Sequence, residues 1–191
     1  MLELPACRLK LSGLAGAIMW NGNSGQDTAG ANDHLGMSAG ARARMRKREV
    51  DVYRYYDDGG RPGVGHCTWG PGILAHRGPC TKEELGRPVG QAEMDAEFAR
   101  RLARSEREVR SGVRKQPLSQ AQFDALVSLA YNAGARGSRG TWKLVEKGDM
   151  EGAAINIKKM TKTTINGRLV VARGLVSRRA EEAAPFLAPS R

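Results

Sequence analysis

The chain has 191 residues, and its 31 lysines and arginines exceed its 20 aspartates and glutamates, which gives a formal net charge of +11. This length and the 40% share of hydrophobic residues indicate one compact domain and exclude a disordered chain. No apolar run approaches the roughly 20 residues of a membrane-spanning helix, so a polytopic membrane protein is excluded as well. The charge predicts attraction to a polyanion such as nucleic acid, acidic lipid or a bacterial cell wall.

Residues 1–36 are predicted to be a separate N-terminal segment, which leaves residues 37–191 for the domain. Residues 11–20 are mildly apolar, follow two basic residues and precede a polar stretch rich in glycine and asparagine. This pattern is a weak signal-peptide shape without a clean cleavage site. An export or anchor segment and a poorly ordered tail are both open interpretations of it.

The first half of the domain is expected to combine helices with short strands. Ser38 is predicted to cap a helix that runs toward Val50, because a serine side chain can accept a hydrogen bond from the first turn. Over residues 51–79, tyrosines followed by a tract rich in glycine and proline indicate short strands joined by turns. A capping box at Thr81 then starts a new helix.

The second half is predicted to be mainly helical. Residues 91–113 form a long amphipathic helix in which apolar residues recur at four-residue spacing. A second capping box at Ser119 opens an apolar helix, which we expect to end at Gly134. Further helices are expected over residues 141–147, 149–160 and 174–184, and Asn166-Gly167 is the expected turn of a hairpin.

Taken in order, these elements predict an α+β fold in which the β part is segregated. A small N-terminal lobe of helix and β-hairpin is linked by the long helix to a mainly helical C-terminal lobe. A cleft between two such lobes would suit an extended substrate.

The chain contains three cysteines, of which Cys67 and Cys80 lie 13 positions apart in a stretch rich in glycine and proline. A disulfide that closes a loop of this size stabilises a fold by about 3 kcal/mol on the chain-entropy model, and it would imply an oxidising compartment. Two free thiols are the alternative. The spacing of the cysteines and histidines does not support a metal site.

One stretch places a carboxylate at the end of a predicted helix and two more at the start of a strand or turn. Glu49 ends the helix, Asp57 and Asp58 follow it, and Thr68 comes after the next loop. Hydrolysis of a glycosidic bond needs a protonated carboxyl that donates to the leaving oxygen and an ionised one that activates water. Burial at a helix end raises the pKa of a glutamate, whereas an aspartate in a wetter loop stays ionised. Solvated surface carboxylates are nevertheless more common, so this spacing alone is weak evidence.

The same stretch resembles the phage-type lysozymes of glycoside hydrolase family 24. Their signature is a helix-terminal Glu, a Tyr seven residues later, an Asp nine residues later and then a Thr-x-Gly-x-Gly turn. Glu49, Tyr56 and Asp58 have this spacing, and residues 68–72 (TWGPG) match the turn. Two departures are Val50, where the family usually has Gly, and a gap before Thr68 that is about four residues longer than usual, which leaves Asp57 and Asp58 as alternatives.

Two later tracts are also similar to this family. The tract AQFDALVSLAYNAG, which contains Asn132, resembles a helix along the cleft floor, and GLVSRR, with Arg178 and Arg179, resembles the C-terminal motif. The two cysteines bracket the hairpin as in a cysteine-containing subgroup. By this resemblance, Glu49 is the general acid, Asp58 with Thr68 orients or deprotonates water, Tyr56, Asn132 and Arg178 contact substrate, and Cys67 and Cys80 form a disulfide.

The resemblance implies an endolysin, a muramidase that inverts the anomeric centre and needs no cofactor or metal. It would cleave the β-1,4 bond between N-acetylmuramic acid and N-acetylglucosamine during bacterial lysis. Its partner would be peptidoglycan, bound by a monomer in the periplasm or outside the cell, with membrane contact only through residues 1–36 and no specific nucleic acid. The alternative is a catalytically inactive module of the same fold that binds peptidoglycan. A nucleic-acid-binding protein is disfavoured, because aromatic residues make up only 5% of the chain.

Overall fold

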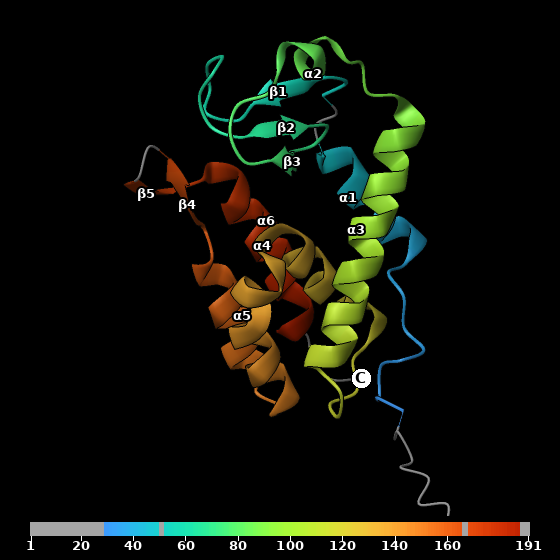
Figure 1. The fold of residues 1–191 in the computed structure, drawn as a ribbon. Coiled ribbons are helices and arrows are strands. Elements are labelled where there is room, and N and C mark those ends of the chain that lie inside the picture. Colours follow the sequence, from blue (N-terminus) through green and yellow to red (C-terminus); the bar gives the residue numbers. More distant parts are fainter. Residues whose placement is uncertain (1–28, 50–51, 166–167, 188–191) are drawn as a thin grey trace, which may run out of the picture.

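A computed structural model describes residues 29–49, 52–165 and 168–187, which form a small sheet lobe and a helical lobe (Figure 1). The predicted α+β arrangement is confirmed. In chain order the first elements are α1 (Ala39–Arg48), β1 (Tyr55–Asp57), β2 (Cys67–Trp69), β3 (Ile73–His76) and α2 (Lys82–Gly86). They are followed by α3 (Gln91–Gly112), α4 (Gln120–Glu146), α5 (Met150–Lys159), β4 (Lys162–Ile165), β5 (Arg168–Val171), α6 (Arg173–Ala183) and the 3-10 turn η1 (Ala184–Phe186).

The sheet lobe is an antiparallel meander in the order β1-β2-β3, with α2 packed beside β1. In its register, Tyr56 lies opposite Thr68 and Asp57 lies opposite Cys67. The predicted capping box at Thr81 is present, because the Thr81 hydroxyl accepts from the Glu84 N–H and the Glu84 carboxylate accepts from the Thr81 N–H. This lobe therefore has local polar links in place of a large core.

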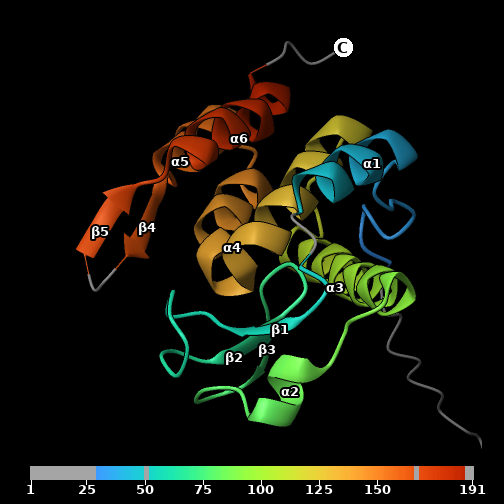
Figure 2. The same cartoon turned by 90° about the horizontal axis from the view of Figure 1, so that it is seen from above.

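The helical lobe is organised around α4, which lies between α3 and the pair formed by α5 and α6 (Figure 2). Phe123, Leu126 and Leu129 are fully buried and form the centre of the main core. The first helical segment of α4 ends at Gly134, as expected, and a second segment starts earlier than the predicted residue 141. Gly134 alone has a non-helical conformation (φ +70°), and the helix resumes directly after it and runs to Glu146. The apolar face continues through the buried Trp142 and Val145, and this packing keeps the second segment helical.

The remaining predicted elements are present near their expected ends. Ser38 accepts a hydrogen bond from the Ala41 N–H, and α1 ends at Arg48, whereas Val50 lies outside the described residues. Asp149 caps α5 in the same way. β4 and β5 pair antiparallel as the expected hairpin, although its turn at 166–167 is outside the described residues.

Residues 29–36, which the sequence prediction placed in the N-terminal segment, pack against the helical lobe. Asn32 is fully buried, and its side-chain amide donates to the carbonyls of Val113 (2.9 Å) and Gln116 (3.0 Å) and accepts from the Leu118 N–H (2.9 Å). The expected boundary at residue 36 is therefore too late, because these bonds make residue 32 part of the folded unit. The predicted apolar stretch 11–20 lies outside the described residues. None of the helices in the described part of the chain has the length and apolar character to span a membrane.

Candidate active site

The helix-terminal carboxylate is Glu49, the C-cap residue of α1. Its backbone is extended, its N–H donates to the Arg46 carbonyl, and the residue is half-buried. The preceding residue, Arg48, forms an ion pair with Glu181 of α6. The C-terminal end of α1 therefore contacts the last helix of the chain directly before Glu49.

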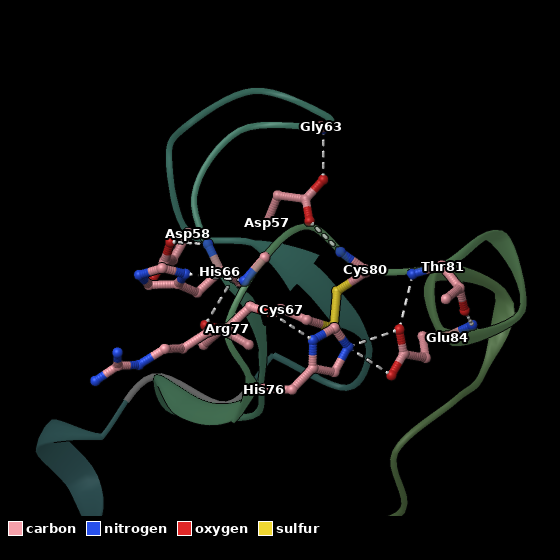
Figure 3. Close-up of a disulfide and its surroundings, with 12 residues drawn as sticks. Asp57, Asp58, Gly63, His66, Cys67, His76, Arg77, Cys80, Thr81 and Glu84 are labelled. Atoms are coloured by element: carbon pink, nitrogen blue, oxygen red, sulfur yellow. Dashed lines mark hydrogen bonds and ion pairs between the residues drawn. A yellow bond between two sulfur atoms is a disulfide. The ribbon is translucent and has the colours of Figure 1, made fainter.

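Asp57 and Asp58 face opposite sides of the sheet, because successive side chains of a strand alternate. The ladder continues past β1, where the Asp58 N–H donates to the His66 carbonyl (3.1 Å). Asp58 therefore shares a face with Tyr56 and with Thr68. Asp57 shares the other face with Cys67. Figure 3 shows this separation, with Asp57 pointing toward Cys80 and Asp58 lying beside His66.

Both carboxylate oxygens of Asp57 are used to hold the loops of this lobe. Oδ2 accepts from the Gly63 N–H (2.6 Å) and Oδ1 accepts from the Cys80 N–H (2.7 Å) (Figure 3). Cys80 is in turn bonded to Cys67, so the predicted disulfide is confirmed. Asp57 is a structural residue by these contacts, and Asp58 is the better candidate for chemistry of the two alternatives.

The extra residues before Thr68 are accommodated without a shift in the register of β1 with β2, whereas the pairing of β2 with β3 is irregular between Cys67 and Thr68. The Gly59 N–H donates to the Val64 carbonyl (3.0 Å), so the loop closes on itself directly after Asp58. Gly65 has φ +95°, and a Cβ on it would clash with the Asp58 carboxylate. Asp58 Oδ1 accepts from the His66 N–H (2.7 Å). The longer loop therefore ends at the pair formed by Asp58 and His66, two residues before Thr68.

Tyr56, Asp58 and Thr68 are brought together on one face. Thr68 is buried, and its hydroxyl donates to the His66 carbonyl (3.2 Å). The pKa of Tyr56 is raised by burial and then by the negative charge of Asp58, against a lowering by the backbone N–H of Gly72. The predicted glycine turn therefore lies next to this face. The turn itself requires glycine at position 70, where φ is +56° and a Cβ would overlap the Met94 sulfur.

On the helical side, Tyr131 lies within electrostatic reach of Glu49. Burial raises the pKa of Tyr131 to about 12, the charge of Arg101 lowers it, and the charge of Glu49 raises it. The Arg101 guanidinium lies 4.8 Å from the centre of the Tyr131 ring. A hollow between the lobes is lined by Tyr131 and Arg101 from the helices and by Gly72 and Leu74 from the sheet lobe. Tyr131 thus connects the candidate acid with the floor of this hollow.

Asn132 is exposed, whereas the two arginines of the C-terminal motif are held inside the lobe. Arg178 donates to Glu182 (3.1 Å) and to the Ser128 carbonyl (3.2 Å). Arg179 is 2% exposed and donates to Glu182 and to the Asn132 side-chain oxygen. The arginine that contacts Asn132 is therefore Arg179, and the substrate contact expected of Arg178 stays a prediction. The sequence signal for Arg179 was the adjacent pair of arginines, which does not show which of them reaches Asn132.

A second hollow lies beside Asn132, between α4 and the β4–β5 hairpin. Besides Asn132 and Arg179, it is lined by Lys159, Lys162 and Leu175. One group of potential metal ligands occurs among the described residues, formed by Cys67, Cys80 and Glu84. Because its two sulfurs are bonded to each other, this group is not a metal site.

Known proteins similar to this chain are lysozymes and endolysins. The family model described as phage lysozyme matches residues 49–182. An endolysin from Acyrthosiphon pisum secondary endosymbiont phage 1 is 38% identical over 74 residues, which are 38% of this chain and 51% of that protein. The chain thus matches about half the length of this curated relative.

Two solved structures share the fold over nearly their whole length. The muramidase domain of SpmX from Asticaccaulis excentricus is 27% identical with a TM-score of 0.61, and the match covers 80% of this chain and 98% of that one. An endolysin from Escherichia coli O157:H7 phage FAHEc1 is 26% identical with a TM-score of 0.64, covering 81% and 94%. The region matched by the family model begins at the candidate acid Glu49 and ends at Glu182, so it includes parts of both lobes.

Proposed function

The chain belongs to the phage lysozyme family, and from this premise we propose that it hydrolyses peptidoglycan as a muramidase. The bond cleaved is the β-1,4 bond between N-acetylmuramic acid and N-acetylglucosamine. The observation that carries the proposal is the placement of Asp58 with Thr68 on one face of the sheet lobe, which follows the helix-terminal Glu49 in the chain. Glu49 and Asp58 are the two carboxyl groups that acid/base hydrolysis of a glycoside requires.

In this proposal Glu49 is the general acid. A general acid must hold its proton near neutral pH, and partial burial favours the neutral carboxyl. Glu49 is half-buried, and the buried hydroxyl and ring of Tyr131 lie within reach of its charge. The proton goes from Glu49 to the glycosidic oxygen as the bond to the anomeric carbon breaks.

Asp58 is the general base that prepares the attacking water. Its face of the sheet lobe carries the Thr68 hydroxyl, which can hold the same water by a hydrogen bond. Asp57 is unsuited to this role, because both of its oxygens already accept backbone N–H groups. Attack by a water molecule on the face opposite the leaving group inverts the anomeric centre.

Substrate contacts come from both lobes. Asn132 is exposed beside the second hollow, and its side chain is held by the buried Arg179. Tyr56 lies on the face that carries Asp58 and is the contact proposed from the sheet lobe. Arg178 is proposed as a structural residue. The place of action is the bacterial cell wall, where a net charge of +11 favours association with anionic polymers.

The proposal is tested by the clearing of purified bacterial cell walls, measured as a loss of turbidity. Glu49→Gln and Asp58→Asn are each expected to lower the rate by about 100-fold to 10,000-fold, the usual contribution of a general acid or base. Asp57→Asn is the matched control on the adjacent residue. It is expected to keep most of the clearing rate and to lower the melting temperature, because it disturbs only the loop contacts.

Two results would contradict parts of this proposal. If the unmodified protein sediments with cell walls but never clears them, the protein is a binding module and not a hydrolase. If Asp57→Asn abolishes clearing while Asp58→Asn does not, the base is Asp57. The anomer that is formed first from a soluble peptidoglycan fragment, followed by NMR, tests inversion independently.

A further inference from the structure

The disulfide lies next to two further side chains that can hold a metal ion, on the face of the sheet lobe opposite Asp58. The sulfurs of Cys67 and Cys80 and a carboxylate oxygen of Glu84 all lie within 4.8 Å of one another. His76 lies opposite Cys67 in the register of β2 and β3, and its Nε2 is 3.0 Å from Glu84 Oε1 (Figure 3). These four side chains have no role in the proposed hydrolysis.

The two sulfurs can act as ligands only when the bond between them is open. Every chain is synthesised with its cysteines as thiols, and the thiol reductants of a cytoplasm keep them in that state. A closed disulfide returns to it when two molecules of a low-molecular-weight thiol donate two electrons and two protons and are themselves joined as a disulfide. The protein therefore has a reduced form, in which two free thiols lie beside Glu84 and His76.

His76 and Glu84 are each oriented by a hydrogen bond to the backbone. Glu84 Oε2 accepts from the Thr81 N–H (2.7 Å), and Nδ1 of His76 lies 3.1 Å from the Arg77 carbonyl. A carbonyl can only accept, so this contact places the proton of a neutral ring on Nδ1 and the lone pair on Nε2, the atom next to Glu84. Histidines and carboxylates that bind metals are held by such outer contacts. The two side chains are thus oriented before any ion is bound.

We propose that these four side chains bind one Zn²⁺ ion in the reduced protein. Two sulfurs, an imidazole nitrogen and a carboxylate oxygen form a donor set that suits tetrahedral Zn²⁺, whereas Mg²⁺ and Ca²⁺ prefer oxygen ligands alone. A tetrahedral zinc site places its ligand atoms about 3.3–3.8 Å apart, which is close to the spacing of this cluster. Binding forms two Zn–S bonds and releases the two thiol protons to water. The ion thereby replaces the disulfide as the cross-link of the sheet lobe.

The surroundings of the cluster fit a metal site that is closed on one side and open on the other. Cys67 is fully buried in the small core of the sheet lobe, which keeps water from its sulfur. The side chains of His76 and Glu84 are 42% and 27% exposed, so the ion has an entry path from their side. The two thiolates neutralise the charge of Zn²⁺, which lowers the cost of placing the ion beside apolar groups.

The first test uses Co²⁺ as a spectroscopic probe of the site. Thiolate ligation gives Co²⁺ a charge-transfer band in the near ultraviolet, and tetrahedral ligation gives it strong bands in the visible range. In the full-length variant Cys7→Ser, the two cysteines of the sheet lobe are the only ones left. We expect this protein, once reduced, to bind one equivalent of Co²⁺ with both features and to lose them when Zn²⁺ displaces the probe. The disulfide form should show neither, because its sulfurs are bonded to each other.

The second test removes one ligand at a time from the same Cys7→Ser protein. Glu84→Gln and His76→Gln are the ligand variants. Glu83→Gln is the control on the adjacent exposed residue, and His34→Gln is the control on an exposed histidine outside the sheet lobe. Because four ligands share the binding free energy of a structural zinc site, loss of one is expected to weaken Zn²⁺ binding about 100-fold. Competition with a chromophoric chelator measures the affinity, and the two controls should match the parent protein.

Hydrogen exchange of the reduced protein tests the cross-link itself. Zn²⁺ should slow exchange in β1, β2 and β3 relative to the same protein in a chelator, and exchange in α4 should stay the same. The disulfide form of each variant needs no metal, so its circular dichroism shows whether the substitution permits folding.

Three results would overturn the inference. The first is a reduced protein whose two thiols react freely with a thiol reagent but give no cobalt bands. The second is equal Zn²⁺ affinity in the ligand variants and the controls, which would mean adventitious binding by two thiols alone. The third is exchange in the sheet lobe that Zn²⁺ does not slow. None of these measurements depends on hydrolysis, so they can fail or succeed independently of the proposed muramidase activity.

Discussion

Apolar burial holds the helical lobe together, whereas the sheet lobe depends on covalent and polar links. In the helical lobe, Phe123, Leu126, Leu129 and their neighbours on α3, α5 and α6 form one continuous core. The sheet lobe has four buried apolar side chains, those of Tyr55, Cys67, Val89 and Met94, in the described part of the chain. The disulfide, the two N–H contacts of Asp57 and the capping box of α2 complete it.

This difference matters because the two proposed carboxylates are supported in different ways. Asp58 is carried by the lobe that has little core, so its position depends on contacts that reductants and pH can change. Glu49 is carried by α1, whose buried Met45 belongs to the main core. The interior of the helical lobe also contains charged groups, the buried carboxylate of Glu182 with the two arginines of α6. Each lobe can therefore be weakened by its own kind of substitution.

The largest effect is expected from Glu182→Gln in the helical lobe. Glu182 is 3% exposed and accepts from Ser128 (2.6 Å), Arg178 and Arg179. Loss of its charge leaves two guanidinium groups in the interior without a counterion, which destabilises a fold by about 3–5 kcal/mol. Urea unfolding followed by far-UV circular dichroism measures this change.

Glu181→Gln is the control on the adjacent residue. The side chain of Glu181 is 58% exposed, and its ion pair with Arg48 is a surface contact. We expect its loss to change the free energy of unfolding by less than about 1 kcal/mol. Similar losses in the free energy of unfolding for Glu182→Gln and Glu181→Gln would mean that the buried ion pairs of Glu182 do not stabilise the helical lobe.

A smaller effect is expected from Cys67→Ala/Cys80→Ala in the sheet lobe. The closed loop spans 13 positions, and its removal is expected to lower the free energy of unfolding by about 3 kcal/mol. Native-state hydrogen exchange should show faster exchange in β1, β2 and β3 but unchanged protection in α4, because the two lobes are supported separately. If exchange in α4 became faster to the same degree, the two lobes would unfold as one unit, which would contradict their separate support.

The local signals explain how much of the fold could be predicted from the sequence. Capping boxes at Thr81 and Ser119 are read from residues three positions apart, and both are present in the structure. Gly134 ends the first segment of α4, as a glycine with positive φ commonly does. The second segment begins directly after Gly134 and not at residue 141, because Trp142 and Val145 pack against distant residues, and no local pattern shows that packing. The packing of Asn32 was missed for the same reason, since its partners are more than 80 positions away.

The candidate site was predictable as a list of residues but not as an arrangement. The motif spacing identified Glu49, Asp58 and Thr68, yet the choice between Asp57 and Asp58 required the register of β1 and β2. That register depends on how the loop after Asp58 closes, which the sequence did not show. Either arginine of the C-terminal motif can pair with Glu182 at helical spacing, but the approach of α6 to α4 decides that Arg179 reaches Asn132.

The smallest expected effect concerns pH and the contact between β3 and α2. His76 Nε2 lies 3.0 Å from a Glu84 oxygen, and its Nδ1 lies 3.1 Å from the Arg77 carbonyl. The pKa of His76 is raised from 6.5, first by the Glu84 hydrogen bond and then by the Arg77 carbonyl. The pKa of Glu84 is lowered from 4.5, first by the backbone N–H of Thr81 and then by His76. Both side chains are partly exposed, so solvent screens this contact and the expected stabilisation is slight.

The direction of the pH dependence follows from these two shifts. A raised histidine pKa stabilises the fold at pH below 6.5, and this contribution is lost as pH rises through the higher pKa of the folded state. A lowered glutamate pKa stabilises it above pH 4.5, and that contribution is lost as pH falls through the lower folded value. The melting temperature of His76→Gln should therefore differ most from that of the unmodified protein between pH 4.5 and 6.5, and the difference should shrink at alkaline pH. A difference that grows with rising pH would mean that the imidazole stabilises the sheet lobe in its neutral form, by packing and not by charge.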